Sequence, residues 1–195
     1  MYAMNAAIDA LKTRLGFDEV VLAGQSGGST IAASLLTLGR KDVTCAVLGS
    51  GAYALADLVH ASIVKSGAKV TRQVVDRTVY DPSKKTAGIA KDAARRIFLL
   101  ADNADERTPY DQQLAFTKDI ARQGHHARLA PILATGDLHH GATPYTLPIA
   151  AMCARDMQDG QIATAIGKMR ANVERLTEKK VSAATPPAPA TTASR

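Results

Sequence analysis

The chain has 195 residues, 46% of them hydrophobic, which is enough for one domain with a substantial core and too little for two large domains. Its net charge is +6, but the basic residues are spread along the chain and form no concentrated patch, so no nucleic-acid partner is expected. No segment approaches the ~20 apolar residues of a membrane span, and Lys12 and Arg14 interrupt the first segment, so the sequence indicates no membrane partner, no signal peptide and a cytoplasmic location.

The first predicted element is a helix over residues 3–15, where apolar side chains recur at helical spacing and Gly16 follows. Residues 19–23, EVVLA, are then apolar on both faces, as expected for a parallel strand that is buried on both sides. A second helix follows a run of glycines and ends near Gly39.

Three further strands are predicted at residues 42–51, 94–102 and 125–135, and Pro131 lacks the N–H that a ladder bond in the last strand would need. A helix over residues 110–123 separates the last two strands. Because strands alternate with helices, the expected fold class is α/β, with a mostly parallel sheet of about four strands flanked by helices.

Residues 52–93 are too many for one crossover, and we predict a cap-like insertion of two helices and an irregular link over the carboxyl edge of the sheet. Apolar side chains at residues 162–176 alternate steps of four and three, which favours a docked terminal helix over a short coiled coil. The expected domain spans residues 1–178, and the tail at 179–195, rich in Pro, Ala and Thr, is expected to be disordered. Candidates for lining a pocket under the insertion are Tyr53, Leu55 and Leu58.

The two cysteines, Cys45 and Cys153, lie in apolar segments and are predicted to be small buried hydrophobic residues. A disulfide framework or a zinc site needs more ligands at closer spacing, so neither is expected. Three histidines, His60, His125 and His126, are expected to be surface or capping residues. No cofactor is indicated, because GQSGGS lacks the features of a phosphate-binding loop.

The sequence GQSGG, residues 24–28, places Ser26 between a predicted strand and a predicted helix. This G-x-S-x-G pattern is typical of a nucleophilic serine on a sharp strand-to-helix turn. Gly24 and Gly28 remove side chains that would collide with the strand and the helix. The helix N-terminus favours negative charge, so the N–H of Gly27 is a candidate donor to an oxyanion.

A serine hydroxyl needs a base, and the base needs a group that orients it. The third strand is followed by ADNADERTPYDQQ, which offers Asp102 and Asp105, and the fourth by TGDLHHGATP, which offers His139 and His140. The carboxyl ends of parallel strands meet at one edge of the sheet, so these side chains can converge on Ser26. Asp111, later in the same segment, is better explained as a first-turn acid of the following helix.

Together these segments resemble the C-terminal two-thirds of α/β-hydrolases, in the manner of dienelactone hydrolases and prolyl-oligopeptidase-like esterases. The resemblance runs from about residue 2 to 157 and rests on VVLAGQSGGS, IFLLADNADERTPYDQQLAF and DLHHGA. It implies a serine hydrolase that acts on an ester or related acyl bond, in which Ser26 attacks, His140 moves the proton and Asp105 orients the imidazole.

The resemblance also ranks the open alternatives. The family's Asp-x-x-x-Pro pattern favours Asp105, four residues before Pro109, over Asp102. A small residue follows the family's histidine, which favours His140 over His139.

Each candidate also has an ordinary structural role open to it. Ser26 could be a loop serine, with Ser29 or Thr30 as the N-cap of the helix. The paired histidines could cap a helix near Thr143.

The resemblance further implies that four strands and a second oxyanion donor of the family lie outside this chain. The strand at residues 19–23 would then form an unprotected edge, and self-association through that edge is expected. The alternative function is a truncated, catalytically impaired remnant that acts at most as a binding or interaction domain. If upstream sequence is missing, any signal peptide is missing with it, and the location is unknown.

Overall fold

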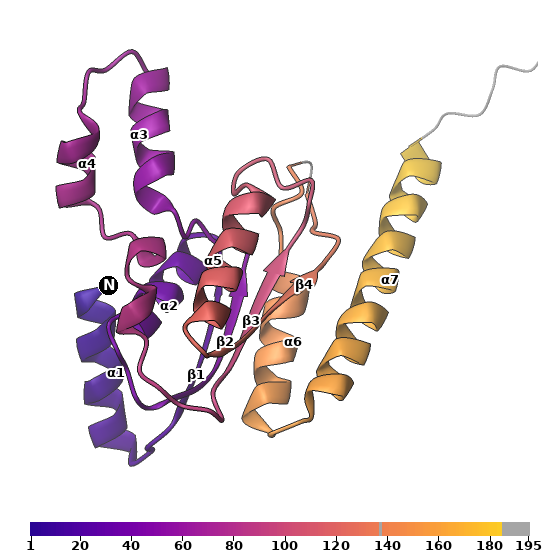
Figure 1. Ribbon diagram of the computed structural model, residues 1–195. Coiled ribbons are helices and arrows are strands. Elements are labelled where there is room, and N and C mark those ends of the chain that lie inside the picture. The colour runs from indigo at the N-terminus through magenta and orange to yellow at the C-terminus, as the bar shows by residue number, and fades with distance from the viewer. Residues whose placement is uncertain (137, 185–195) are drawn as a thin grey trace, which may run out of the picture.

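Four parallel strands form the centre of the protein, in the spatial order β1-β2-β3-β4 (Figure 1). The structure is a computed structural model and describes residues 1–136 and 138–184. The predicted α/β class and parallel sheet are confirmed. The strands are β1 (Val20–Gln25), β2 (Val43–Gly49), β3 (Arg96–Ala101) and β4 (His126–Pro131).

The register brings the carboxyl ends of the strands together at one edge of the sheet. Gln25 pairs with Gly49, Gly49 with Leu100, and Ala101 with Pro131. The loops that follow β1, β3 and β4 therefore begin close to one another, as the sequence pattern requires.

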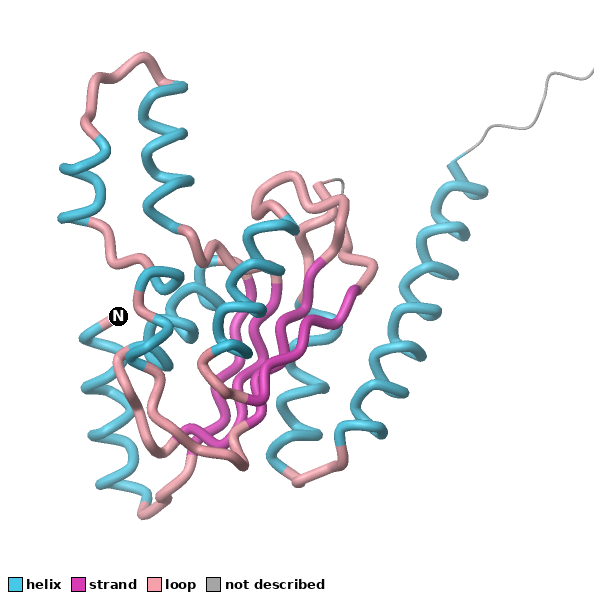
Figure 2. The backbone as a smooth tube through the Cα atoms, in the orientation of Figure 1, coloured by secondary structure: helices cyan, strands magenta, loops and turns pink. Residues whose placement is uncertain are grey.

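Helices cover both faces of the sheet (Figure 2). The helices α1 (Tyr2–Leu15), α2 (Gly27–Thr37) and α5 (Tyr110–Arg122) cover one face, and α6 (Thr143–Ala154) and α7 (Asp159–Ala184) cover the other. Successive strand residues point to opposite faces, so both faces must be apolar. In β2, for example, Ala46 and Leu48 belong to the core cluster under α2 and α5, whereas Cys45 and Val47 belong to the cluster under α6.

The insertion at residues 52–93 contains two helices, α3 (Leu55–Lys65) and α4 (Arg72–Thr78), followed by the short 3-10 helices η1 (Pro82–Lys84) and η2 (Thr86–Gly88). Figure 1 shows α3 and α4 as a hairpin that projects away from the body of the protein. Each of the two helices has a single buried residue.

Tyr53, which was predicted to line a pocket, is instead a core residue. Its side chain is fully buried, and its ring stacks on Phe116 with 4.4 Å between the ring centres. Its hydroxyl lies 2.8 Å from the hydroxyl of Ser29. Tyr53 therefore anchors the start of the insertion to α2 and α5.

The terminal helix α7 docks on α6, as the apolar spacing predicts. Ile162, Ile166 and Val173 are buried, whereas Leu176, near the far end of the pattern, is half exposed. The helix extends to Ala184, so the tail prediction was wrong for residues 179–184. The rest of the predicted tail lies outside the described residues.

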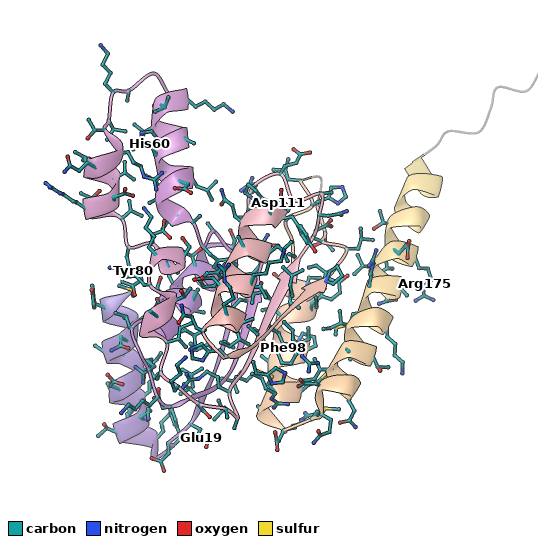
Figure 3. The ribbon with its side chains drawn as sticks, in the orientation of Figure 1. Glu19, His60, Tyr80, Phe98, Asp111 and Arg175 are labelled. Carbon is teal, nitrogen blue, oxygen red and sulfur yellow. A yellow bond between two sulfur atoms is a disulfide. The ribbon has the colours of Figure 1, made fainter. Side chains whose placement is uncertain are left out.

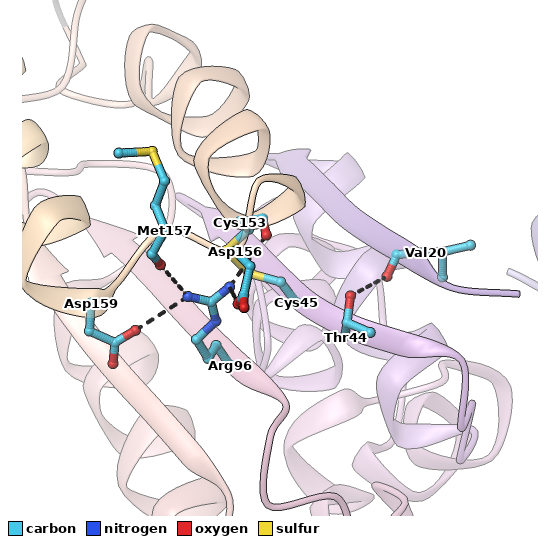
Figure 4. Close-up of a disulfide and its surroundings, with 8 residues drawn as sticks. All are labelled: Val20, Thr44, Cys45, Arg96, Cys153, Asp156, Met157 and Asp159. Atoms are coloured by element: carbon cyan, nitrogen blue, oxygen red, sulfur yellow. Dashed lines mark hydrogen bonds and ion pairs between the residues drawn. A yellow bond between two sulfur atoms is a disulfide. The ribbon is translucent and has the colours of Figure 1, made fainter. Parts of the chain in front are cut away.

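Cys45 and Cys153 form a disulfide, so their prediction as separate hydrophobic residues was wrong (Figure 4). The two residues are 108 positions apart in the sequence, but α6 packs over β2 and brings their Cα atoms to 6.2 Å. Sequence spacing carries no signal of such a pairing. The cross-link joins the middle of the sheet to the last turn of α6.

In the described part of the chain β1 pairs only with β2 and so forms an edge of the sheet. This agrees with the edge position expected from the sequence. Among the described residues, no helix has the length and apolar character that crossing a membrane would require.

Candidate active site

Ser26 occupies the turn between β1 and α2, with φ 55° and ψ −124°. A positive φ at a residue other than glycine is uncommon. Such backbone costs on the order of 1–3 kcal/mol and persists only where the surroundings fix it. Here the N–H of Ser26 donates to the carbonyl of Gly49 at 2.9 Å, and its own carbonyl accepts from the N–H of Thr30 at 3.1 Å.

The glycines around Ser26 do not act symmetrically. A Cβ on Gly24 would lie 2.4 Å from the backbone of Gly28 and 2.6 Å from the nitrogen of Ser29, so only glycine fits at this position. A Cβ on Gly28 would meet no atom within 4 Å. The steric prediction is thus correct for Gly24 and wrong for Gly28.

His140 links Ser26 to Asp105. Its Nε2 lies 2.8 Å from the Ser26 Oγ, and its Nδ1 lies 3.1 Å and 3.0 Å from the two carboxylate oxygens of Asp105. With the proton on Nδ1 shared with Asp105, Nε2 is free to accept the serine proton. The three side chains come from the loops after β1, β3 and β4.

Asp105 is a buried carboxylate that accepts several hydrogen bonds. Its Oδ1 accepts from the N–H groups of Arg107 and Thr108, both at 2.9 Å, and its Oδ2 accepts from the Thr108 hydroxyl at 2.8 Å. Burial alone would raise the pKa of Asp105, but the Thr108 N–H, His140 and the remaining donors outweigh it and lower the pKa below its ordinary value. The carboxylate is therefore held ionised beside the imidazole.

Asp102 and His139 lie outside the contacts that join Ser26, His140 and Asp105. Asp102 accepts from the N–H of Ala104 at 2.9 Å and from the N–H of Ala134 at 2.7 Å, which ties the end of β3 to the loop after β4. The Nδ1 of His139 lies 3.4 Å from Asp102, and the half-exposed ring makes no hydrogen bond to Ser26 within the described residues.

The loop that carries His140 is closed at its base. Thr135 and Gly141 exchange both backbone hydrogen bonds, each at 2.9 Å. A Cβ on Gly141 would lie 2.3 Å from the Thr135 hydroxyl, so the small residue after His140 is required by this contact. The N–H of Glu106 also donates to the carbonyl of Leu138, which joins this loop to the one that carries Asp105.

Gln25 is a site residue that the sequence did not reveal. Its amide N–H donates to the carbonyl of His140 at 3.0 Å, and its amide oxygen accepts from the hydroxyl of Thr143 at 2.8 Å. One side chain next to Ser26 therefore holds both the His140 loop and the start of α6. Nothing in the sequence marks a glutamine for this role.

Thr108 was also missed, although a local signal was present. A side-chain carboxylate commonly accepts from N–H groups two and three residues later. The position of Thr108, three residues after Asp105, fits that pattern. The buried side chain of Gln113 then holds Thr108 by donating to its carbonyl at 3.0 Å.

The ordinary roles proposed for Ser29 and Thr30 are not observed. The N-cap position of α2 is Ser26, and no side chain caps the helix. Ser29 contacts Tyr53, and the Thr30 hydroxyl contacts the carbonyls of Ser26 and Ala52. Gly27, the first residue of α2, has an N–H with no partner inside the helix, as at any helix start.

The remaining histidines lie away from Ser26. Figure 3 places His60 in the projecting hairpin and Asp111 at the start of α5, where a first-turn acid was predicted. His126 lies 3.2 Å from Asp159. His125 was predicted to be a surface or capping residue, but it is buried, and neither ring nitrogen has a partner in the described part of the protein.

Within residues 1–136 and 138–184, no group of three His, Cys, Asp or Glu side chains is placed to hold a metal ion.

No protein-family model matches the chain, and no curated protein matches it. Several solved structures are similar. A Pyrococcus horikoshii acylaminoacyl peptidase has a TM-score of 0.54 at 15% identity, over 70% of this chain and 23% of the peptidase. A Pyrococcus furiosus esterase has a TM-score of 0.50 at 16% identity, over 66% of this chain and 51% of the esterase. A Bacillus anthracis α/β-fold hydrolase has a TM-score of 0.49 at 12% identity, over 83% of this chain and 72% of the hydrolase.

The match to the peptidase and the esterase shows an α/β-hydrolase-like fold, and this confirms the resemblance noted in the sequence. The similarity is partial, since the chain spans about half of the esterase and about a quarter of the peptidase. At these identities the comparison establishes the fold alone.

Proposed function

We propose that the protein is a serine hydrolase that cleaves an ester or related acyl bond through Ser26, His140 and Asp105. The observation that carries the proposal is the continuous chain of contacts from the Ser26 Oγ to His140 and from His140 to Asp105. Three loops far apart in the sequence supply these residues, and the turn at Ser26 has the positive φ of a strained nucleophile position.

In the first half of the reaction, the Ser26 Oγ attacks the acyl carbon while its proton moves to His140 Nε2. The carbonyl oxygen becomes an oxyanion, to which the N–H of Gly27 at the start of α2 donates. The bond to the leaving alcohol or amine then breaks, and the leaving group takes the proton from Nε2. The product of this half is an acyl ester on Ser26.

In the second half, water attacks the acyl ester and gives a proton to His140 Nε2. The tetrahedral species collapses, the carboxylic acid leaves, and Ser26 recovers its proton from Nε2. Asp105 keeps the imidazole in the required tautomer in both halves and stabilises the imidazolium that forms. Its lowered pKa supports this role, because the carboxylate stays ionised at neutral pH.

The test is hydrolysis of p-nitrophenyl butanoate by the purified chain and by Ser26→Ala. We expect the substitution to abolish turnover while the circular dichroism spectrum and the melting temperature stay close to those of the parent chain. Ser62→Ala is the matched control, since this exposed serine lies in α3, in the projecting hairpin. Equal turnover by Ser26→Ala and the parent chain would reject the nucleophile assignment.

The same measurement tests the alternative function, which is that of a catalytically impaired binding domain. If the parent chain is folded but neither hydrolyses the ester nor becomes acylated, the alternative replaces the hydrolase proposal.

A further inference from the structure

A cavity of about 410 Å³ opens beside Ser26 on the side of α2 and the insertion. Its size is within the ~300–1,000 Å³ range of small-molecule sites. Figure 3 shows Tyr80 at the base of the projecting hairpin, next to the start of α1. The walls come from the serine turn, α2, the start of α3 and the link after α4. The lining residues are Met1, Ser26, Gly27, Thr30, Ile31, Ser34, Ala52, Leu55, Val79 and Tyr80.

No charged side chain is among the described residues that line this cavity. The polar side chains have partners in the protein already. Ser34 donates to the carbonyl of Thr30 at 2.8 Å, and the hydroxyl of Thr30 lies 3.2 Å from the carbonyl of Ala52. The hydroxyl of Tyr80 lies 2.9 Å from that of Thr37. A carboxylate or ammonium group in this cavity would therefore lose water without meeting an oppositely charged side chain among the described lining residues.

The cavity lies on the acyl side of the proposed reaction. The leaving group must lie next to His140 Nε2, because it takes its proton from that nitrogen. Ser26 and Gly27 line the cavity, but no described residue of the loop at 135–143 does. A group bound in the cavity is thus next to the attacked carbon and away from the proton donor, which is where the acyl chain lies.

We propose that this cavity binds the acyl chain of the substrate and selects uncharged aliphatic chains. The inference rests on the proposed hydrolase function and names its substrate class. Leu55 and Ile31 supply branched aliphatic surface to the cavity and are its specificity-determining residues. Of the predicted lining residues Tyr53, Leu55 and Leu58, only Leu55 lines this cavity.

The experiment compares kcat/KM for p-nitrophenyl acetate, butanoate and hexanoate with that for the hemisuccinate ester. Each buried CH₂ should raise kcat/KM by up to about fourfold. The hemisuccinate, similar in length to butanoate but charged, should react at least tenfold more slowly than butanoate. In a second series, ethyl, butyl and hexyl acetates should differ by less than about twofold, since the alcohol lies outside the cavity.

Leu55→Ala and Ile31→Ala should each lower kcat/KM for the hexanoate by about three- to tenfold and lower that for the acetate by a smaller factor, so that the dependence on acyl length becomes shallower. Val64→Ala is the matched control, because Val64 is an exposed apolar residue farther along α3 that does not line the cavity. Ile31 is itself partly exposed, so its replacement is expected to be tolerated by the fold.

The outcomes separate this inference from the proposal on which it rests. If a fluorophosphonate labels Ser26 but the acyl series is flat, or the alcohol series is the steep one, the acyl assignment of the cavity is wrong and the hydrolase function stands. If Ser26 is not labelled at all, the hydrolase function fails and this inference fails with it.

Discussion

At the residue scale, the position of Gln25 has a direct consequence for catalysis. Its side chain holds the His140 carbonyl and the Thr143 hydroxyl, so its loss frees the imidazole loop without disturbing the core. We predict that Gln25→Ala lowers kcat by roughly tenfold, the worth of about one hydrogen bond, with KM and melting temperature nearly unchanged.

Two further variants make this prediction specific. Gln25→Glu loses the donor to His140 but keeps the acceptor for Thr143, and we expect it to resemble Gln25→Ala in kcat. Thr143→Val removes only the hydrogen bond from the Thr143 hydroxyl to the Gln25 amide oxygen, and it should have the smaller effect on kcat. An unchanged kcat in Gln25→Ala would show that the loop holds His140 without this contact.

His125 makes a separate prediction at this scale, for stability against pH. Burial, followed by the charges of Lys91 and Arg95, lowers the pKa of His125 from its ordinary value of 6.5. Below about pH 6.5 this histidine binds a proton more readily in the unfolded chain than in the folded one, so protonation favours the unfolded chain. The contribution of the neutral, buried His125 to stability is therefore complete above about pH 6.5 and is lost as the pH falls through the lowered pKa. We predict that His125→Leu reduces the loss of stability between pH 7.5 and pH 5, measured by urea unfolding at each pH. An identical loss in the parent chain and in His125→Leu would contradict the prediction, and His126→Gln serves as the control.

At the element scale, the disulfide joins β2 to α6, the helix that begins just after the His140 loop. A cross-link over a separation of about 100 residues stabilises a protein by ~4.7 kcal/mol in the chain-entropy account, and by typically 2–5 kcal/mol in measurements. We predict that the double replacement Cys45→Ser with Cys153→Ser lowers the free energy of unfolding by about 2–5 kcal/mol. A parent chain that is reduced under denaturing conditions, refolded and kept reduced should show the same decrease in the free energy of unfolding.

Thiol titration checks the premise of that prediction. The purified chain, unfolded in guanidinium without reductant, should show no free thiol. Two titratable thiols per chain, with no change in stability on adding reductant, would mean that the cross-link does not form.

The elements also show where sequence analysis succeeds and where it fails. Local patterns predicted the strands and the turn at Ser26, because alternation of elements and glycine position depend on neighbouring residues. The segments that supply Asp105 and His140 could be ranked only through the family resemblance, and their catalytic roles stay predictions. The Cys45–Cys153 pairing, the Gln25 contacts and the burial of His125 depend on packing between distant segments, which no local pattern encodes.

At the scale of the whole molecule, the edge strand β1 makes a prediction about association. β1 has one strand neighbour in the described sheet, and Ala23 within it is exposed. Several large apolar side chains of α1 are also exposed, which adds apolar surface to the molecule. They are Tyr2, Met4, Leu11 and Leu15.

We therefore expect the chain to self-associate through β1, and we expect Ala23→Lys to reduce association because a charge on an edge strand blocks pairing. Size-exclusion chromatography with light scattering over a range of concentrations measures this. A parent chain that stays monomeric at every concentration would refute the association. An Ala23→Lys variant that associates as strongly as the parent would show that the chain associates through a surface other than β1. Val64→Lys, on the projecting hairpin, is the control for added charge.

The proposed hydrolase function depends on Ser26 being an activated nucleophile. The most direct test is to treat the folded chain with a fluorophosphonate and to locate the adduct by peptide mass spectrometry, in the parent chain and in His140→Ala. We predict a single adduct on Ser26 in the parent chain and labelling slower by at least a hundredfold in His140→Ala, since the imidazole takes the serine proton. No adduct on Ser26 in the folded parent chain, or equal labelling rates with and without the imidazole, would contradict the account.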